Sequence, residues 1–439
     1  MDKLNILVLH SLGNPKTAPN FLRHHVFFLQ ENLPEHNYIY HDTAFALPEY
    51  VSATAFDAII LDVTFLCARW AEPEQFESLK ETYAFVQHSE AVKIAFPQDE
   101  YDCHILLDDW MCEWGVDVVY SVISSGWDLL YPRYHTIGEI RLGYTGYVSE
   151  AMLRMLPKAF DDRMIDIGYR ARKLPPYFGR VGETKWKIGQ AIESACASTE
   201  LKTDIVLGDE GTLHGTAWLD FINNCKFTLG ANSGSSLLDP RGDIQRRVRA
   251  YLNEFPEATF EQVEEHCFKG LDGHHSFTAL SPRVLEAGLL KSCQILVEGQ
   301  YSGIVRAWEH FIPIKEDASD FDRVHQAMGD QSRIAQMIAN CRAAILDVED
   351  LRYKNKARKV IDVIGDLVSR KGVVSDCDAV EKTSKRYRND VANKYVRLWR
   401  RQELSRRLSD MSAAHPSFSH VLRFARSMRS LLIRQGNGT

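Results

Sequence analysis

The sequence lacks long hydrophobic runs, since no stretch reaches about 18 uninterrupted apolar residues, the length that predicts a membrane-spanning helix. Residues 1–9 form a short apolar segment without the cleavage site of a signal peptide. The nine cysteines are scattered and form no Cys-x-x-Cys pair, which argues against a disulfide framework and a structural zinc site. These absences predict a cytoplasmic protein with reduced thiols.

The signatures of several enzyme classes are also missing. Neither the Gly-x-Gly-x-x-Gly spacing of dinucleotide-binding proteins nor a P-loop occurs, and no Gly-x-Ser-x-Gly elbow or His-Glu-x-x-His motif is present. The Asp-x-Asp signature of metal-dependent sugar transferases does not occur in a matching context. We therefore expect no metal site and no tightly bound cofactor, and hydrolase and metalloprotease chemistry has no motif to support it.

What the sequence has is an ordinary globular composition with an uneven charge. Of its 439 residues, 45% are hydrophobic and 25% are charged, which is typical of a chain that folds into two domains with extra material. The net charge is −7, yet residues 331–439 carry 23 Lys and Arg against 11 Asp and Glu. A basic C-terminal part on an acidic body indicates a separate role for that part.

Apolar runs typical of buried parallel strands alternate with helical segments along most of the chain. In the first half the expected strands are 5–9, 38–40, 56–62, 92–96 and 116–120, and the expected helices are 21–33, 73–89 and 104–114. In the second half the expected strands are 165–170, 204–207, 225–230 and 294–297, and the expected helices are 184–198 and 279–290. This pattern predicts two Rossmann-like α/β domains that face each other across a cleft, with ligands at the carboxyl ends of the strands.

The predicted domains are residues 1–160, residues 161–325 and a basic helical extension over 326–439. Within the extension, residues 421–432 place apolar side chains at helical spacing, with arginines off that stripe. Such a helix could pack on the first domain or lie in an anionic membrane interface. Nucleic-acid binding is not favoured, because stacking aromatics are few and no recognition motif is present.

The strongest local signal is the segment 281–287, Ser-Pro-Arg-Val-Leu-Glu-Ala, followed by the strand 294–297. A carboxylate in the first turn of a helix that faces a cleft, here Glu286, can accept two hydrogen bonds from a ribose diol. The alternative is that Glu286 only complements the helix macrodipole.

This segment resembles the Pro-Arg-x-x-Glu-Ala segment of bacterial GT-B glycosyltransferases, in which the Glu binds the ribose of the sugar nucleotide. The resemblance continues through 298–303 and 310–315. It implies a donor-binding set that includes Ser281, Arg283, Glu286, Tyr301, Ser302 and Gly303. Many retaining members carry a second Glu eight positions before the first, where this chain has Thr278.

A second resemblance covers residues 168–185, where GT-B enzymes place an Arg and a Lys on the donor diphosphate. Arg170, Arg172 and Lys185 are the candidates, because fixed cations stabilise the charge of a leaving diphosphate. The Gly/Ser segment 230–236 contributes Ser233 and Gly234, whose backbone N–H groups could cradle phosphate oxygens. The alternatives are a solvated basic loop and a tight turn that needs small residues.

Candidate catalytic residues of the first domain follow its strands. Asp99 and Glu100 come after the strand 92–96, where a carboxylate could act as general base toward an acceptor hydroxyl or bind the acceptor. His10 follows the first strand and precedes Gly13. We do not expect Asp99 and Glu100 to form a metal pair, because neighbours on an extended chain point to opposite sides.

The resemblance implies a glycosyltransferase that moves a sugar from a nucleotide sugar to a bacterial glycan, in polysaccharide, lipopolysaccharide or capsule biosynthesis. The expected partners are a nucleotide-sugar donor, as co-substrate, and a glycan or lipid-linked glycan acceptor, with peripheral contact to the inner face of the cell membrane. Two alternatives stay open, a sugar-nucleotide epimerase of the same fold and an inactive scaffold that binds glycan or nucleotide.

Overall fold

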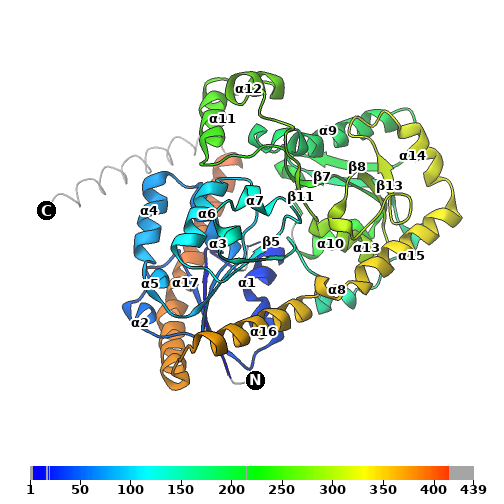
Figure 1. Cartoon of the computed structure of the whole chain (residues 1–439). Helices are drawn as coiled ribbons and strands as arrows, with labels where there is room; N and C mark the ends of the chain where they lie inside the picture. The colour runs from blue at the N-terminus through cyan, green and yellow to red at the C-terminus, as the bar shows by residue number, and fades with distance from the viewer. Residues whose placement is uncertain (1–2, 16–17, 19, 214, 415–439) are drawn as a thin grey trace.

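The computed structural model describes residues 3–15, 18, 20–213 and 215–414. Within them, two parallel β-sheets follow one another along the chain, each flanked by helices, and longer helices complete the described part (Figure 1). The expected fold class, two Rossmann-like α/β units with C-terminal helices, is therefore confirmed. The segment 421–432 lies outside the described residues. No described helix combines the length and the apolar content that a bilayer crossing requires.

The first sheet has six strands in the order β2-β1-β3-β4-β5-β6, and every neighbouring pair is parallel. The strands are β1 (Asn5–His10), β2 (Asn37–Asp42), β3 (Ala58–Leu61), β4 (Val92–Ala95), β5 (Val118–Ser121) and β6 (Glu139–Leu142). The apolar runs predicted the first five. The edge strand β6 was not predicted, because its side chains are exposed or half-buried and form no apolar run.

Helices flank this sheet on both faces, as crossovers between parallel strands require. They include α1 (Asn20–Asn32), α2 (Glu49–Ser52), α3 (Val63–Leu66), α4 (Pro73–Thr82), α5 (Phe85–His88), α6 (His104–Glu113) and α7 (Trp127–Leu130). The short helix α8 (Glu150–Leu153) contacts the second half of the chain instead. The single helix expected over 73–89 is wrong, because the chain turns between α4 and α5. There the buried ring of Tyr83 packs against Phe65, and its hydroxyl lies 2.8 Å from Nε2 of His41.

The second sheet has five parallel strands in the order β13-β12-β9-β7-β8. They are β7 (Ile165–Ala171), β8 (Thr203–Leu207), β9 (Cys225–Gly230), β12 (Cys293–Val297) and β13 (Ile312–Ile314). Two short strands, β10 (Ser233–Ser235) and β11 (Phe277–Ala279), pair antiparallel beside it. The segment between β10 and β11 carries α11 (Asp243–Glu254) and α12 (Phe260–Cys267), which project from the body (Figure 1).

The remaining helices of this half are α9 (Gly179–Cys196), α10 (Thr216–Asn223), α13 (Pro282–Leu289) and α14 (Phe321–Met328). Helix α9 starts five residues before the expected 184. Distant side chains accept from its first N–H groups: Asp272 from Arg180 (2.9 Å), and Ser236 from Val181 (3.2 Å). A start that depends on such partners leaves no local signal in the sequence.

The C-terminal helices α15 (Gln331–Asp347), α16 (Tyr353–Lys371) and α17 (Cys377–Ala414) pack on the body. Helix α15 contacts α13 in the second half, α16 returns to pack on α1, and α17 runs along β2 (Figure 1). Helices α16 and α17 therefore pack on the first half of the chain, whereas α15 stays on the second.

Loops hold the two halves together near the carboxyl end of β4. The N–H of Asp239 donates to the carbonyl of Tyr101 (3.0 Å), and the N–H of Ile105 donates to the carbonyl of Pro240 (3.0 Å). The ring of Tyr101 also stacks with Phe277 at 6.3 Å. The loop that carries Asp99 is therefore fastened to the second half of the chain.

Candidate functional site

A cavity of about 220 Å³ lies among α9, α10, α13 and the strands β7 and β9, and we call it the cationic cavity. Its lining includes six of the residues expected to bind the donor: Arg170, Arg172, Lys185, Ser233, Ser281 and Arg283. The carboxyl ends of β7 and β9 contribute Ala171 and Gly230. Ligands of open α/β sheets bind at this edge.

Two cations of this cavity come from different helices. Lys185 lies in α9, and burial lowers its pKa to about 8, an effect that Arg283 reinforces and the carboxylate of Asp99 opposes. Arg283, from the first turn of α13, donates to the carbonyl of Arg170 and lies 5.0 Å from the ring centre of Trp218. Two cations in one cavity, with Asp99 of the facing half nearby, suit an anionic ligand.

The two other arginines differ in how firmly they are held. Arg170 forms a 2.8 Å ion pair with Asp204 and lies 4.0 Å from the ring centre of Phe221, so its guanidinium is already engaged. Arg172 lies at the rim, where 66% of its side chain is exposed and its partner Asp209 is 3.5 Å away. Of the two, Arg172 has the freedom to turn toward a ligand.

Glu286 lies in the second turn of α13, so its expected place in the first turn is wrong. Pro282 takes the first helical position, and no acidic residue lies in the first turn. The carboxylate accepts a 2.7 Å hydrogen bond from the indole N–H of Trp218. Burial raises the pKa of Glu286 to about 7, against the opposing effects of Trp218 and Arg283. Glu286 itself does not line the cationic cavity, and only its partner Trp218 does.

Trp218 was not singled out in the sequence, although it links the cavity to Glu286. It lies on α10 and is separated from Glu286 by 68 positions. A single tryptophan on a short helix gives no pattern that distinguishes a site residue from a core residue.

The Gly/Ser segment is a short strand rather than the expected open loop. Gly234 pairs with Thr278 of β11, and a Cβ on Gly234 would lie 1.8 Å from the carbonyl oxygen of Phe277. Its φ of 140° is also one that glycine tolerates best. Gly234 therefore allows the backbones of β10 and β11 to approach each other closely beside the cationic cavity.

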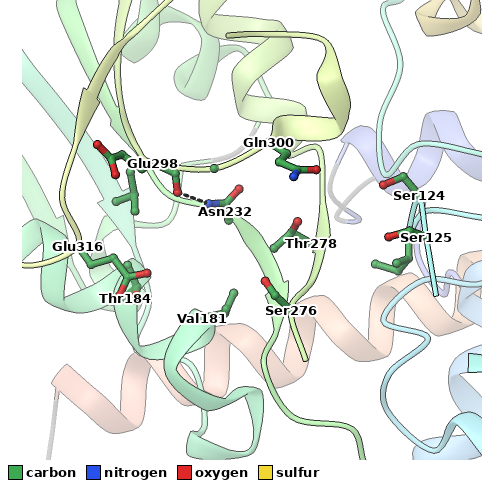
Figure 2. A pocket seen from close by; sticks show the side chains of 13 residues that line it. Ser124, Ser125, Val181, Thr184, Asn232, Ser276, Thr278, Glu298, Gln300 and Glu316 are labelled. Carbon is green, nitrogen blue, oxygen red and sulfur yellow. Dashed lines mark hydrogen bonds between the residues drawn. The ribbon is translucent and has the colours of Figure 1, made fainter. Parts of the chain in front are cut away.

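A second cavity, of about 340 Å³, opens between the two halves, and we call it the interdomain cavity (Figure 2). Ser124 and Ser125, which follow β5, line it from the first half. Residues after β9, β12 and β13, together with α9 and β11, line it from the second half: Val181, Thr184, Asn232, Ser276, Thr278, Glu298, Gly299, Gln300 and Glu316.

The expected donor residues 301–303 follow Gln300 and turn the chain. Tyr301 is buried, and its hydroxyl donates to the carbonyl of Val297 (2.6 Å). Ser302 and Gly303 have φ values of 53° and 73°, the left-handed region of a tight turn. These three residues shape the loop that closes one side of the interdomain cavity.

The three candidate catalytic residues lie in different environments. Asp99, with φ 49°, is half-buried and accepts a 2.6 Å hydrogen bond from the hydroxyl of Tyr101. Arg69 donates to the carbonyls of Gln98 (2.7 Å) and Asp99 (2.9 Å) and so holds this loop. Asp99 is therefore a fixed carboxylate of the first half, and its negative charge opposes the lowering of the pKa of Lys185.

Glu100 and His10 are both fully buried. The carboxylate of Glu100 accepts from the hydroxyl of Tyr131 (2.8 Å) and the N–H of Val122 (3.1 Å), and burial raises its pKa to about 7. Burial lowers the pKa of His10, whose Nδ1 lies 3.8 Å from Asp42. Neither residue lines the two cavities. Among the described residues, no cluster of His, Cys, Asp or Glu could hold a metal ion.

No family model and no curated protein matches the chain. Several solved structures resemble it. An alpha-glucosyltransferase in complex with UDP and a 13-mer DNA is 10% identical, with a TM-score of 0.46 over 83% of this chain and 100% of its own. Sucrose-phosphate synthase from Thermosynechococcus elongatus is 11% identical, with a TM-score of 0.46 over 84% and 100%. HepE from Anabaena in complex with UDP-glucose is 11% identical, with a TM-score of 0.43 over 82% and 100%. Similarity this distant assigns no residue and no substrate.

Proposed function

We propose that this protein is a GT-B glycosyltransferase that transfers a sugar from a nucleotide sugar to a glycan acceptor. The observation that best supports the proposal is the cationic cavity. Lys185, Arg283 and Trp218 line it, Glu286 is bound to Trp218, and the charge of Asp99 in the facing half acts on the pKa of Lys185. The cations suit a diphosphate, and the Glu286 carboxylate, held by Trp218 next to the cavity, is the candidate partner of a ribose.

In this proposal the donor diphosphate lies between Lys185 and Arg283, with Arg172 turning in from the rim. The leaving nucleoside diphosphate gains negative charge during transfer, and cations that are already in position stabilise that charge without reorganisation. This is the task that a metal ion has in other transferases, so we propose transfer without a bound metal. The ribose hydroxyls donate to Glu286, whose carboxylate Trp218 orients.

The acceptor enters from the first half of the chain in this proposal, and Asp99 is the candidate general base. The hydrogen bond from Tyr101 and the grip of Arg69 on the loop keep its carboxylate in place. A base has to lie within hydrogen-bond reach of the proton that it removes, and a carboxylate that is already fixed needs no rearrangement to do so. We propose that the acceptor is a bacterial glycan or a lipid-linked glycan.

The test is release of nucleoside diphosphate from a panel of nucleotide sugars, with and without glycan acceptors. We expect acceptor-dependent release that falls at least about tenfold in Lys185→Ala. Lys187→Ala is the matched control, because Lys187 lies on the same helix and is exposed. A change of the donor sugar without acceptor would indicate an epimerase, and nucleotide binding without any release would indicate a scaffold. Either result would contradict the proposal.

A further inference from the structure

The interdomain cavity is lined by negatively charged groups, in contrast to the cationic cavity beside it. Its charged lining residues are Glu298 and Glu316, and no Lys, Arg or His belongs to the described residues that line it. The polar remainder consists of hydroxyl and amide side chains: Ser124, Ser125, Thr184, Asn232, Ser276, Thr278 and Gln300. Such a surface offers hydrogen bonds to hydroxyl groups and no cationic partner to an anion.

The two cavities adjoin at three places in the chain. Thr184 lines the interdomain cavity and Lys185 the cationic one, and the same holds for Val297 and Leu296. Asn232 and Ala231 form the third such pair of neighbours. The two cavities are therefore near neighbours in the second half of the chain. On the proposed function, the anionic part of the ligand lies beside Lys185 and the sugar lies among the carboxylates.

One polar side chain of the interdomain cavity, that of Asn232, is held in place. The amide of Asn232 donates to the carbonyl of Glu298 (3.2 Å). Gly299 permits this approach, since a Cβ there would lie 2.2 Å from Nδ2 of Asn232. Figure 2 shows the carboxylate of Glu316 beside Thr184, across the cavity from Thr278.

On the proposed function the transferred sugar lies in the interdomain cavity, and we propose that Glu316 and Glu298 there select an uncharged sugar over a hexuronate. This inference rests on the proposed function. The hydroxyls of a neutral sugar donate to the two carboxylates and accept from the amides of Asn232 and Gln300. A hexuronate carboxylate would lose water without gaining a cation, and it would lie near like charges.

The size of the cavity agrees with this role. Ligand pockets of proteins measure roughly 300–1,000 Å³, and the interdomain cavity, at about 340 Å³, lies at the small end of that range. The cavity is therefore suited to a single sugar ring more than to a complete nucleotide sugar, whose remaining parts need the cationic cavity.

The experiment compares donors that share a nucleotide and differ only at the sugar: UDP-glucose with UDP-glucuronate, and GDP-mannose with GDP-mannuronate. Affinity is measured by calorimetry, and kcat/KM by diphosphate release. We expect the neutral donor to be favoured at least about tenfold, since two partly screened carboxylates each repel a third by about a few-fold in binding. In Glu298→Gln/Glu316→Gln that ratio should fall severalfold, mainly because the hexuronate donor improves.

The matched control is Glu193→Gln/Glu200→Gln, which removes two exposed carboxylates from the same half and should leave the ratio unchanged. Equal use of both donors by the wild type, or an unchanged ratio in Glu298→Gln/Glu316→Gln, would overturn the inference. UDP and GDP without a sugar are measured in parallel. If neither diphosphate binds, the proposed function itself fails, a result that differs from loss of sugar selectivity.

Discussion

At the scale of residues, burial lowers the pKa of both Lys185 and Lys356, yet their surroundings differ. Lys185 lies in a cavity beside Arg283 and faces Asp99. Lys356 of α16 lies under three aromatic rings, those of Phe28, Phe96 and Tyr147, at 4.2–4.6 Å. The first is open to a ligand, whereas the second joins the C-terminal helices to the core of the first sheet.

The pH dependence of kcat/KM should be bell-shaped. Glu286 has a pKa of about 7, so only above that pH is it a carboxylate that accepts hydrogen bonds from both ribose hydroxyls. Lys185 has a pKa of about 8 and is positively charged only below that pH. Activity should therefore rise through pH 7 and fall above pH 8. Glu286→Gln should lose the acidic limb, and Lys185→Arg should move the basic limb beyond pH 10. Lys187→Arg should keep both limbs, and profiles identical in all variants would remove both groups from the site.

The stability of the fold should depend on pH through Lys356. Burial lowers its pKa from 10.5 to about 7, so between these values the unfolded chain binds one more proton than the folded chain. The unfolding free energy of the wild type relative to Lys356→Met should therefore rise with pH from about 7 to 10, by up to about 1.4 kcal/mol per pH unit. Denaturant titrations at several pH values measure it. Lys354→Met, at an exposed position of the same helix, should show no such slope.

At the scale of elements, the antiparallel pair β10–β11 decides where the segment before α13 runs. The two strands are separated in the chain by α11 and α12, and Gly234 allows their backbones to meet. This pair brings Thr278 to the interdomain cavity and Ser281 to the cationic cavity. The short strand β10 thus helps to position lining residues of both cavities.

Gly234→Ala should therefore destabilise the protein. A Cβ would lie 1.8 Å from the carbonyl oxygen of Phe277, and backbone cannot give way as a flexible side chain can. We expect a loss of about 2–4 kcal/mol in unfolding free energy, measured by denaturant titration. Gly329→Ala, where a Cβ would meet only an ordinary 3.4 Å contact, should change stability by less than about 0.5 kcal/mol. Similar losses in both variants would contradict the close-approach argument.

At the scale of the whole molecule, the chain crosses between the two halves more than once. It passes from the first sheet to the second near residue 160, and α16 and α17 return to the first sheet. The loop after β4 is fastened to the second half by Asp239 and Pro240. Motions of one half relative to the other have to bend these connections, which keeps Asp99 close to Lys185.

The basic segment after α17 allows a prediction for the whole protein. Residues 415–439 contain Arg423, Arg426, Arg429 and Arg434 and no acidic residue. The triple variant Arg423→Gln/Arg426→Gln/Arg429→Gln should reduce sedimentation with vesicles of anionic lipid several-fold, since each charge near such a surface contributes about 1 kcal/mol. Diphosphate release in solution should change little. Unchanged sedimentation would argue that this segment has no membrane role.

Most strands of the fold could be predicted from the sequence, because the apolar pattern of a strand lies within a few consecutive residues. A strand buried on both faces needs a continuous apolar run, and such runs marked nine of the strands, from β1 to β12. The edge strand β6 and the early start of α9 were missed, because their stability comes from distant partners. For α9 these are Asp272 and Ser236.

The sequence by itself determined the two α/β units and the supply of cations and carboxylates in the second half, since periodicity and side-chain chemistry belong to the chain. Only the tertiary structure decided which of these groups meet. Trp218 reaches Glu286, Asp99 faces Lys185, and Glu298 shares a cavity with Glu316 because crossovers and strand order bring distant segments to one edge of a sheet. That edge is created by packing, so no local pattern in the chain describes it.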